Sequence, residues 1–365
     1  MTRRAPELPD FPWDALAGHK ATAHAHPGGA VDLSIGTPVD PVPAGIRDAL
    51  ASVSEIPGYP ATHGTPALRA AALDALSRRH GVEGLEPDAV LPTIGSKELV
   101  AWLPRLLGFG PGDTVVIPEL SYPTYEVGVL LAGASVLRSD GLVALGPQRP
   151  AMIWLNSPSN PTGRVLGVDH LRKVVEWARE RDVIVVSDEC YLALGWDAEP
   201  VSLLHPSVHG GRTDGLLAVH SLSKSANLAS YRAGFVTGDP ALVAELLAVR
   251  KHAGMIVPRP VQEAMVAALV DDEALAAQRD RYARRRTVLR KALRDNGFQI
   301  DHSEAGLYLW ATRGEDAWET VRWLAERGIL VAPGTFYGPA GAQHVRIALT
   351  ATDERVDVAA ERLAQ

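Results

Sequence analysis

The sequence has a single cysteine, no long apolar run and no excess of positive charge, and each absence argues against a class of protein or partner. Since Cys190 is the only cysteine in 365 residues, no internal disulfide can form, which suits a reducing, cytoplasmic compartment. No apolar run approaches the ~20 residues of a membrane span, so no membrane partner is expected. The net charge of −7 argues against nucleic acid and anionic membrane surfaces. Met1 to Asp14 carries Arg3 and Arg4 with no apolar run behind them, so no secretory signal is expected.

The composition and pattern that are present are those of a soluble α/β protein. Hydrophobic residues make up 46% and charged residues 22% of the chain, which is typical of a globular protein with a large core. Short apolar runs alternate with amphipathic stretches, which predicts a mostly parallel sheet flanked by helices. Four runs are predicted as buried strands, namely residues 115–117, 152–155, 183–186 and 216–219. We predict a large domain over residues 41–244 and a smaller α+β domain formed by 1–40 and 245–365.

Two charged stretches are expected to have no ligand. Arg279 to Arg294 is interpreted as the solvated face of a helix rather than a nucleic-acid patch. His24 and His26 stand beside Pro27-Gly28-Gly29, which predicts a flexible loop rather than a metal site, and no metal is predicted. We find no internal repeat and no low-complexity tract.

Three polar clusters follow predicted strands, where open α/β sheets collect their ligands. Asn160 follows the strand at 152–155, Asp188 follows the strand at 183–186, and Lys224 follows the strand at 216–219. Each has an ordinary explanation: Asn160 as a turn residue, Asp188 as a strand exit and Lys224 as a surface lysine. Arg232 could likewise be a surface cation. Their order favours one shared site. The spacing is 28 residues from Asn160 to Asp188, 36 from Asp188 to Lys224 and 8 from Lys224 to Arg232.

Such a site would suit pyridoxal phosphate, which needs an amine, an anion for its ring nitrogen, donors for its phenolic oxygen, and donors with positive charge for its phosphate. Lys224 could form the Schiff base once burial and neighbouring charge lower its pKa. Asp188 could keep the ring nitrogen protonated, which lets the ring act as an electron sink. The other candidates are hydrogen-bond donors: Asn160 and Tyr191 for the phenolic oxygen, and Ser221, Ser223 and Arg232 for the phosphate.

These motifs resemble those of the class I/II aminotransferases, which are pyridoxal phosphate enzymes of fold type I. The similarity rests on Asn-Pro-Thr-Gly at 160–163, Asp-x-x-Tyr at 188–191, and Ser-x-Ser-Lys at 221–224 followed by Arg-x-Gly at 232–234. It extends over roughly residues 30 to 350. The resemblance makes Lys224 the catalytic lysine. It also implies further site residues: Gly36, Asn160 and Arg346 for the substrate, Ser96 and Lys97 around the phosphate, Tyr122 stacked on the ring, and Tyr59 at the phosphate of a neighbouring subunit.

Elementary chemistry agrees with three of these positions and leaves ordinary alternatives open. Ser96 and Lys97 open a predicted helix that ends near Leu107, and the free N–H groups and dipole of a helix start favour an anion. An ordinary helix cap would have the same sequence. Arg346 lies in a strand-like run and could hold a carboxylate with its rigid fork, or it could be a surface arginine. Tyr122 could be a core aromatic residue.

The resemblance implies a ping-pong amino transfer between small-molecule amino acid and keto acid substrates, in an obligate homodimer with shared active sites. The freed Lys224 amine would act as the general base. Residues 95–102 and 223–235 look most like the actinobacterial type of succinyldiaminopimelate aminotransferase. That type implies glutamate as donor and N-succinyl-2-amino-6-ketopimelate, from lysine and diaminopimelate biosynthesis, as acceptor. A long acidic substrate should need a second cation, for which the candidates are Lys97, Arg138, Arg164 and Arg259.

Other functions remain open at this stage. The enzyme could be an aminotransferase for aspartate, alanine or an aromatic amino acid. A pyridoxal phosphate lyase or decarboxylase could use the same pocket, although Arg346 favours keeping the carboxylate. An effector-binding regulator on this fold would need a DNA-binding domain, and only ~30 residues precede the family-like region, which is short for a domain.

Overall fold

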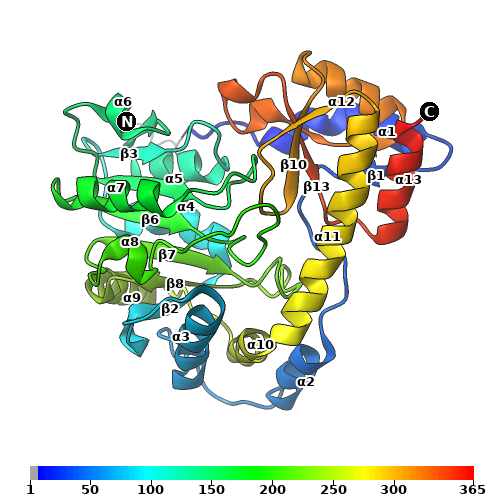
Figure 1. Cartoon of the computed structure of the whole chain (residues 1–365). Coiled ribbons are helices and arrows are strands. Elements are labelled where there is room, and N and C mark those ends of the chain that lie inside the picture. Colours follow the sequence, from blue (N-terminus) through cyan, green and yellow to red (C-terminus); the bar gives the residue numbers. More distant parts are fainter. Residues whose placement is uncertain (1–6) are drawn as a thin grey trace, which may run out of the picture.

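A seven-stranded sheet forms the centre of the protein (Figure 1). The computed structural model describes residues 7–365, so Arg3 and Arg4 lie outside the described residues. The strand order is β2-β8-β7-β6-β5-β3-β4, and the bounds are β2 (Val90–Ile94), β3 (Thr114–Ile117), β4 (Ser135–Arg138), β5 (Met152–Asn156), β6 (Ile184–Asp188), β7 (Leu216–Ser221) and β8 (Ala233–Gly238). Only β8 runs antiparallel to its neighbours within the sheet of the described chain. The mostly parallel sheet confirms the predicted α/β class. The four predicted strands correspond to β3, β5, β6 and β7, although Val183 lies just before β6.

Helices cover both faces of this sheet because neighbouring strand residues point to opposite faces. In β5, Ile153 and Leu155 pack into one core, whereas Met152 and Trp154 pack into the other. The first core contains residues from α3 (Pro66–His80), α7 (Val168–Arg179) and α10 (Arg259–Val270). The second contains residues from α4 (Ser96–Leu106), α5 (Thr124–Ala132) and α9 (Pro240–Ala253). Strands that are buried on both faces explain the continuous apolar runs in the sequence.

A smaller antiparallel sheet is built from the C-terminal third of the chain. Its order is β12-β13-β10-β9, with bounds β9 (Gln299–Asp301), β10 (Tyr308–Thr312), β12 (Ala332–Pro333) and β13 (Val345–Ala348). The N-terminal segment joins this region because β1 (Val31–Asp32) pairs in parallel with β11 (Ile329–Leu330). The other elements are η1 (Pro12–Leu16), α1 (Ala17–Ala25), α2 (Ala44–Ser52), η2 (Pro87–Ala89), α6 (Leu142–Leu145), α8 (Pro206–His209), α12 (Ala317–Glu326), η3 (Gly334–Phe336), η4 (Pro339–Gly341) and α13 (Asp353–Leu363).

The long helix α11 (Asp272–Asp295) runs from beside α2 and α10 to α12 and α13 (Figure 1). Its arginines are not all solvated, so the predicted solvated face is wrong at two positions. Arg285 and Arg286 are buried, at 3% and 8% exposure. Arg285 forms ion pairs with Asp40 and Asp353, and Arg286 pairs with Asp197. Carboxylates from distant segments meet these arginines only after the chain has folded, which sequence periodicity cannot show.

The division into domains at residues 41–244, 1–40 and 245–365 stays a prediction. Residues of α9 and α10, at 240–270, pack into the two cores beside the large sheet. Residues 282–363 instead share a core with Leu16, Ala23, Val31 and Leu33. This packing favours a second boundary closer to the start of α11.

The described residues show no feature of a membrane span or of a metal centre. No helix within residues 7–365 has both the length and the apolar character to cross a bilayer. No group of three His, Cys, Asp or Glu side chains in the same part of the chain could hold a metal ion. The loop predicted at His24 and His26 is wrong for His24, which lies inside α1, whereas His26 follows the last helical residue, Ala25.

Candidate active site

A cavity of about 310 Å³ lies where the strands β5, β6 and β7 end. Its lining contains every residue predicted to bind the cofactor or the substrate α-carboxylate except Tyr59: Gly36, Ser96, Lys97, Tyr122, Asn160, Asp188, Tyr191, Ser221, Ser223, Lys224, Arg232 and Arg346. Because the carboxyl ends of parallel strands meet at one edge of a sheet, clusters far apart in sequence become neighbours there. The ordered spacing in the sequence therefore corresponds to one cavity.

Lys224 lies in the turn after β7, with its amine inside the cavity. Its Nζ donates a hydrogen bond to the carbonyl oxygen of Gly36. Burial lowers the pKa of the Lys224 amine, because a desolvated ammonium loses its hydration. A lowered pKa favours the neutral amine, which is the form that can react with a carbonyl carbon.

Asp188 is the last residue of β6 and is only 7% exposed. Its Oδ2 accepts a hydrogen bond from the Tyr125 hydroxyl at 2.8 Å, and its Oδ1 accepts one from the Cys190 N–H at 3.2 Å. Burial raises the pKa of Asp188, although these hydrogen bonds oppose the rise. A protonated ring nitrogen beside this carboxylate would compensate the buried charge.

Asn160 is held in place by Asn156 at the end of β5. Asn156 Oδ1 accepts from the Asn160 N–H at 2.7 Å, while its Nδ2 donates to the Asp188 carbonyl at 2.9 Å. Asn160 Oδ1 accepts from Arg346 Nη1 at 2.9 Å. This bond fixes the side-chain amide so that its NH₂ group is the part available to an acceptor, such as a phenolic oxygen.

The start of α4 and the side chain of Arg232 form an anion site. In the described chain no side chain caps α4, so Ser96 and Lys97 begin the helix with N–H groups open to a ligand. The preceding Gly95 has φ of +74°, and a Cβ there would lie 2.3 Å from Arg232 Nη2. The acidic residue of the first turn, Glu98, pairs with buried Arg250 at 3.0 Å and is thereby neutralised. This donor set, with Ser221 and Ser223 lining the same cavity, fits a phosphate.

Arg346 of β13, in the small sheet, forms a second anion site in the same cavity. It is 2% exposed, and its guanidinium carbon lies 3.9 Å from the Tyr308 ring centroid. Its Nη2 donates to the Ser34 carbonyl at 2.6 Å, while its Nε has no hydrogen-bond partner within residues 7–365. A Cβ on Gly36 would lie 2.2 Å from the Tyr308 hydroxyl oxygen, so only glycine fits beside this site. A buried guanidinium with a free donor suits a carboxylate ligand.

Of the four candidate cations for a distal acidic group, Lys97 alone lines this cavity. Its Nζ lies 5.7 Å from the Phe11 ring centroid and 6.0 Å from that of Tyr122. Burial, and then the charge of Arg232, lower the pKa of Lys97. The other three candidates lie elsewhere: Arg138 pairs with Glu126, Arg259 pairs with Glu263, and Arg164 lines a separate cavity beside α7.

Several cavity residues escaped the sequence interpretation. Tyr125 and Asn156 lie inside or beside recognised motifs, and this proximity in sequence could have identified them. Ile35 and Thr37 flank the predicted Gly36, whereas nothing local marks Phe11 and Trp13 of the N-terminal segment or Tyr308 of β10. Tyr59 is outside the cavity of its own chain and is 99% exposed, so its predicted contact with a neighbouring subunit stays a prediction.

Comparison with known proteins identifies the family of this chain. The class I and II aminotransferase family matches residues 29–363. A probable aminotransferase of Mycobacterium tuberculosis is 69% identical, over 98% of this chain and 85% of that protein. The 4-dedimethylamino-4-oxo-anhydrotetracycline transaminase OxyQ of Streptomyces rimosus is 60% identical, over 98% of this chain and 99% of that protein. The solved structure of a probable N-succinyldiaminopimelate aminotransferase of Thermus thermophilus has a TM-score of 0.86 and 30% identity, over 97% and 99% of the two chains. The predicted family, fold and cofactor are confirmed: the chain belongs to the class I and II aminotransferases, which depend on pyridoxal phosphate.

Proposed function

We propose that this aminotransferase moves an amino group from glutamate to a keto acid with a distal carboxylate, namely N-succinyl-2-amino-6-ketopimelate of diaminopimelate and lysine biosynthesis. The observation that carries the proposal is that Lys97 and Arg346 line one cavity. A dicarboxylic substrate needs two cations, one for each end, and Arg232 is committed to the phosphate site. The Thermus relative named above and LL-diaminopimelate aminotransferases of Dehalococcoides mccartyi, 32% identical, support this substrate class.

The cavity residues have distinct roles in this proposal. Pyridoxal phosphate, when bound, supplies the aldehyde carbon and the electron-withdrawing ring. The Lys224 amine takes the proton from the substrate α-carbon and returns it to the cofactor side as the general acid. Asp188 holds the proton on the ring nitrogen, and Asn160 and Tyr191 donate to the phenolic oxygen. Arg346 binds the α-carboxylate and thereby orients the α-hydrogen toward Lys224.

The phosphate and ring contacts complete the assignment. Ser96, Lys97, Ser221, Ser223 and Arg232 would hold the phosphate, with Lys97 using its backbone N–H there and its side chain toward the substrate. Tyr122 would stack on the ring.

The proposal also includes a homodimer in a cytoplasmic setting. Tyr59 is 99% exposed in one chain and is therefore accessible to a second subunit, where it would reach the phosphate site. The single cysteine, Cys190, is compatible with a reducing compartment.

A second candidate acceptor is a flat ring ketone. Aromatic side chains line the cavity on the side of the N-terminal segment, namely Phe11, Trp13 and Tyr122. The Streptomyces relative, 60% identical, is named for an anhydrotetracycline substrate. Aromatic walls would suit a planar acceptor better than a flexible aliphatic one.

The test is to mix the cofactor-loaded enzyme, without oxygen or acceptor, with glutamate, N-succinyldiaminopimelate, aspartate, alanine and an aromatic amino acid in turn. We expect the first two to convert the cofactor absorbance to that of pyridoxamine phosphate. In Lys97→Met the half-saturating concentration of these two should rise about tenfold or more, since a hydrogen bond to a charged group contributes ~1.5–3 kcal/mol, while alanine should be unaffected. Lys251→Met, which alters an exposed lysine of α9, is the matched control.

Each other outcome selects a different function. Conversion by other donors with no dependence on Lys97 would discard the dicarboxylic substrate and keep the aminotransferase. In a second step with the pyridoxamine phosphate form of the enzyme, amination of a planar ring ketone, but not of N-succinyl-2-amino-6-ketopimelate, would favour the second candidate. A cofactor absorbance that survives every donor would favour a lyase.

A further inference from the structure

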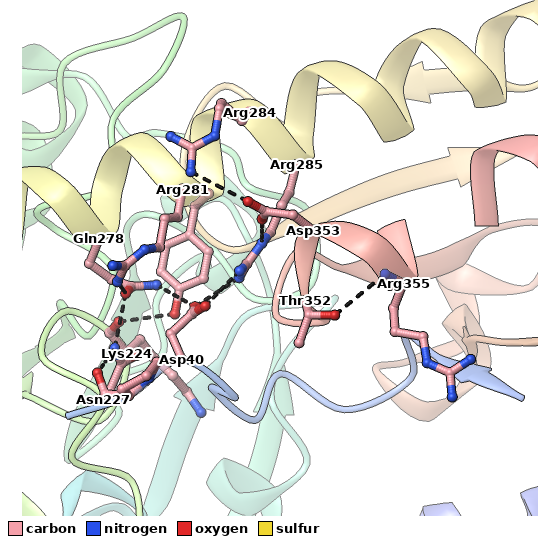
Figure 2. A network of polar contacts seen from close by, with 12 residues as sticks. Asp40, Lys224, Asn227, Gln278, Arg281, Arg284, Arg285, Thr352, Asp353 and Arg355 are labelled. Atoms are coloured by element: carbon pink, nitrogen blue, oxygen red, sulfur yellow. Dashed lines mark hydrogen bonds and ion pairs between the residues drawn. The ribbon is translucent and has the colours of Figure 1, made fainter. Parts of the chain in front are cut away.

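A buried polar cluster joins the turn that carries Lys224 to the long helix α11 and to α13 (Figure 2). Its centre is Asp40, whose carboxylate accepts from Arg285 Nη1 at 2.8 Å and Nη2 at 2.6 Å, and from Gln278 Nε2 at 2.8 Å. We call these three residues the Asp40 clamp. Arg285 Nε also donates to Asp353 Oδ1 at 2.6 Å, at the start of α13.

The Asp40 clamp is shielded from water and has a defined bidentate geometry. The side chains of Arg285 and Asp40 are 3% and 9% exposed. The two parallel N–H bonds from one guanidinium to one carboxylate fix direction as well as distance. These features distinguish it from the exposed pair that Arg284 makes with Asp353, where the side chains are 60% and 48% exposed.

On the other side, the Asp40 clamp contacts the turn of Lys224. Asn227 Nδ2 donates to Gln278 Oε1 at 2.9 Å and to the Pro41 carbonyl at 3.2 Å. The φ of Asn227 is +58°, a left-handed conformation that a non-glycine residue adopts at a cost. The Tyr282 hydroxyl of α11 donates to the Lys224 carbonyl at 3.2 Å. The lysine turn is therefore attached to α11 at two points, the Lys224 carbonyl and the Asn227 side chain.

The Asp40 clamp also anchors the segment that contacts both Arg346 and Lys224. Residues 34–41 contact Arg346 through the Ser34 carbonyl at 2.6 Å, and Lys224 Nζ through the Gly36 carbonyl. No strand or helix contains Gly36 to Asp40, so side-chain anchors must hold this backbone. Asp40 and Pro41 are the anchored end.

We propose that Asp40 is a positioning residue for catalysis, which acts by holding the Lys224 turn and the Gly36 segment in one fixed relation. The inference rests on the proposed role of Lys224 as the proton carrier. With the Asp40 clamp intact, the amine stays within reach of the α-hydrogen of a substrate bound at Arg346. Without it, the lysine turn and the Gly36 segment shift independently, and proton transfer slows although cofactor and substrate still bind.

The test compares Asp40→Asn with Asp40→Glu, Asn227→Gly and the control Arg284→Gln, all loaded with cofactor. Asp40→Asn removes the charge, and Asp40→Glu restores it. Asn227→Gly keeps the backbone conformation but removes both amide bonds, so it tests the link if Asp40→Asn fails to fold. Arg284→Gln removes an exposed ion pair of the same helix. The first readout is the single-turnover rate with α-protio and α-deutero forms of whichever of glutamate, aspartate or alanine the unaltered enzyme converts fastest.

We expect Asp40→Asn to slow this rate about 10- to 100-fold, because a misplacement near 1 Å can cost that much. The deuterium isotope effect should rise, and the half-saturating donor concentration should change by less than the rate. Asn227→Gly should show a smaller change of the same kind, Asp40→Glu should recover much of the rate, and Arg284→Gln should match the unaltered enzyme. A normal rate and isotope effect in folded, loaded Asp40→Asn or Asn227→Gly would overturn the proposal.

A second readout needs no substrate. The pH midpoint at which the absorbance of the lysine-bound cofactor changes reports the surroundings of Lys224. It should shift in Asp40→Asn and Asn227→Gly but not in Arg284→Gln, and an unchanged midpoint would contradict the positioning role. If the unaltered enzyme converts none of the donors, the proposed function fails, and this absorbance titration still decides the role of Asp40.

Discussion

The cofactor side and the substrate side of the cavity are built in different ways. The cofactor side comes from the ends of adjacent parallel strands, at Asn156 of β5, Asp188 of β6 and Ser221 of β7. Backbone ladders fix the three positions, since Asn156 pairs with Asp188, and Ser221 pairs with Gly234 of β8. The substrate side combines the N-terminal segment with β10 and β13, which lie some 300 residues away in the chain. The cofactor side is therefore held by a continuous sheet, and the substrate side by a few long-range contacts.

This difference predicts where substitutions act. Changes on the cofactor side should affect the chemical step or the stability of the sheet edge. Changes on the substrate side should affect the binding and orientation of the amino acid. Loops held by few contacts are also the parts that open most easily.

The largest expected effect is at Lys224 on the cofactor side. Lys224→Ala should lose turnover by at least about 10⁴-fold, since it removes both the nucleophile and the general base, while some cofactor stays bound without a covalent link. Steady-state turnover and the absorbance of the protein-bound cofactor measure the two parts. Lys251→Ala is the matched control on an exposed helix face. Normal turnover in Lys224→Ala would refute the proposed chemistry altogether.

A smaller effect is expected at Arg346 on the substrate side. Arg346→Lys keeps the charge but loses the planar fork, and Nε, Nη1 and Nη2 cannot all be replaced by one ammonium. We expect kcat/KM for the donor to fall about 100-fold, in line with a loss of ~2–4 kcal/mol at a buried charge pair, with cofactor affinity unchanged. Arg355→Lys, at an exposed position of α13 (Figure 2), should behave like the unaltered enzyme. Weakened cofactor binding with intact donor affinity would mean that the two sides of the cavity have been assigned the wrong way round.

The smallest expected effect concerns stability at Glu189, directly behind Asp188. Burial raises the pKa of Glu189 to about 7, although hydrogen bonds from the Leu203 N–H and the Ser202 hydroxyl act to lower it. Between the ordinary pKa of 4.5 and about 7, the folded protein keeps a proton that the unfolded chain has released. The free energy of unfolding therefore falls as pH rises through this window, by on the order of 3 kcal/mol.

Glu189→Gln cannot titrate and should lose this pH dependence. Relative to the unaltered protein, its urea midpoint should be higher at pH 8 than at pH 5. Glu83→Gln, at an exposed position, is the control. Parallel pH curves for Glu189→Gln and the unaltered protein would show that folding does not raise the pKa of Glu189.

The two sides also differ in how well the sequence predicted them. Asn160, Asp188 and Lys224 were found because each lies close after a recognisable apolar run, and parallel strands bring such positions together. Arg232 was found by its spacing from Lys224. Phe11, Trp13 and Tyr308 were missed because no local pattern separates a cavity aromatic residue from a core one. The choice among four distal cations could not be made either, since ion pairs with Glu126 and Glu263 remove Arg138 and Arg259 only in the folded chain.

The sequence by itself determined the α/β class, the strands β3, β5, β6 and β7, and the cofactor-side residues, since apolar periodicity and short motifs act over a few residues. Only the tertiary structure decided that Arg285 is buried against Asp40, that Phe11 and Trp13 line the cavity, and that Lys97 is the one of the four candidate distal cations that lines it. These outcomes depend on the pairing of β1 with β11 and on the packing of α11. They join residues hundreds of positions apart, and no local propensity encodes such contacts.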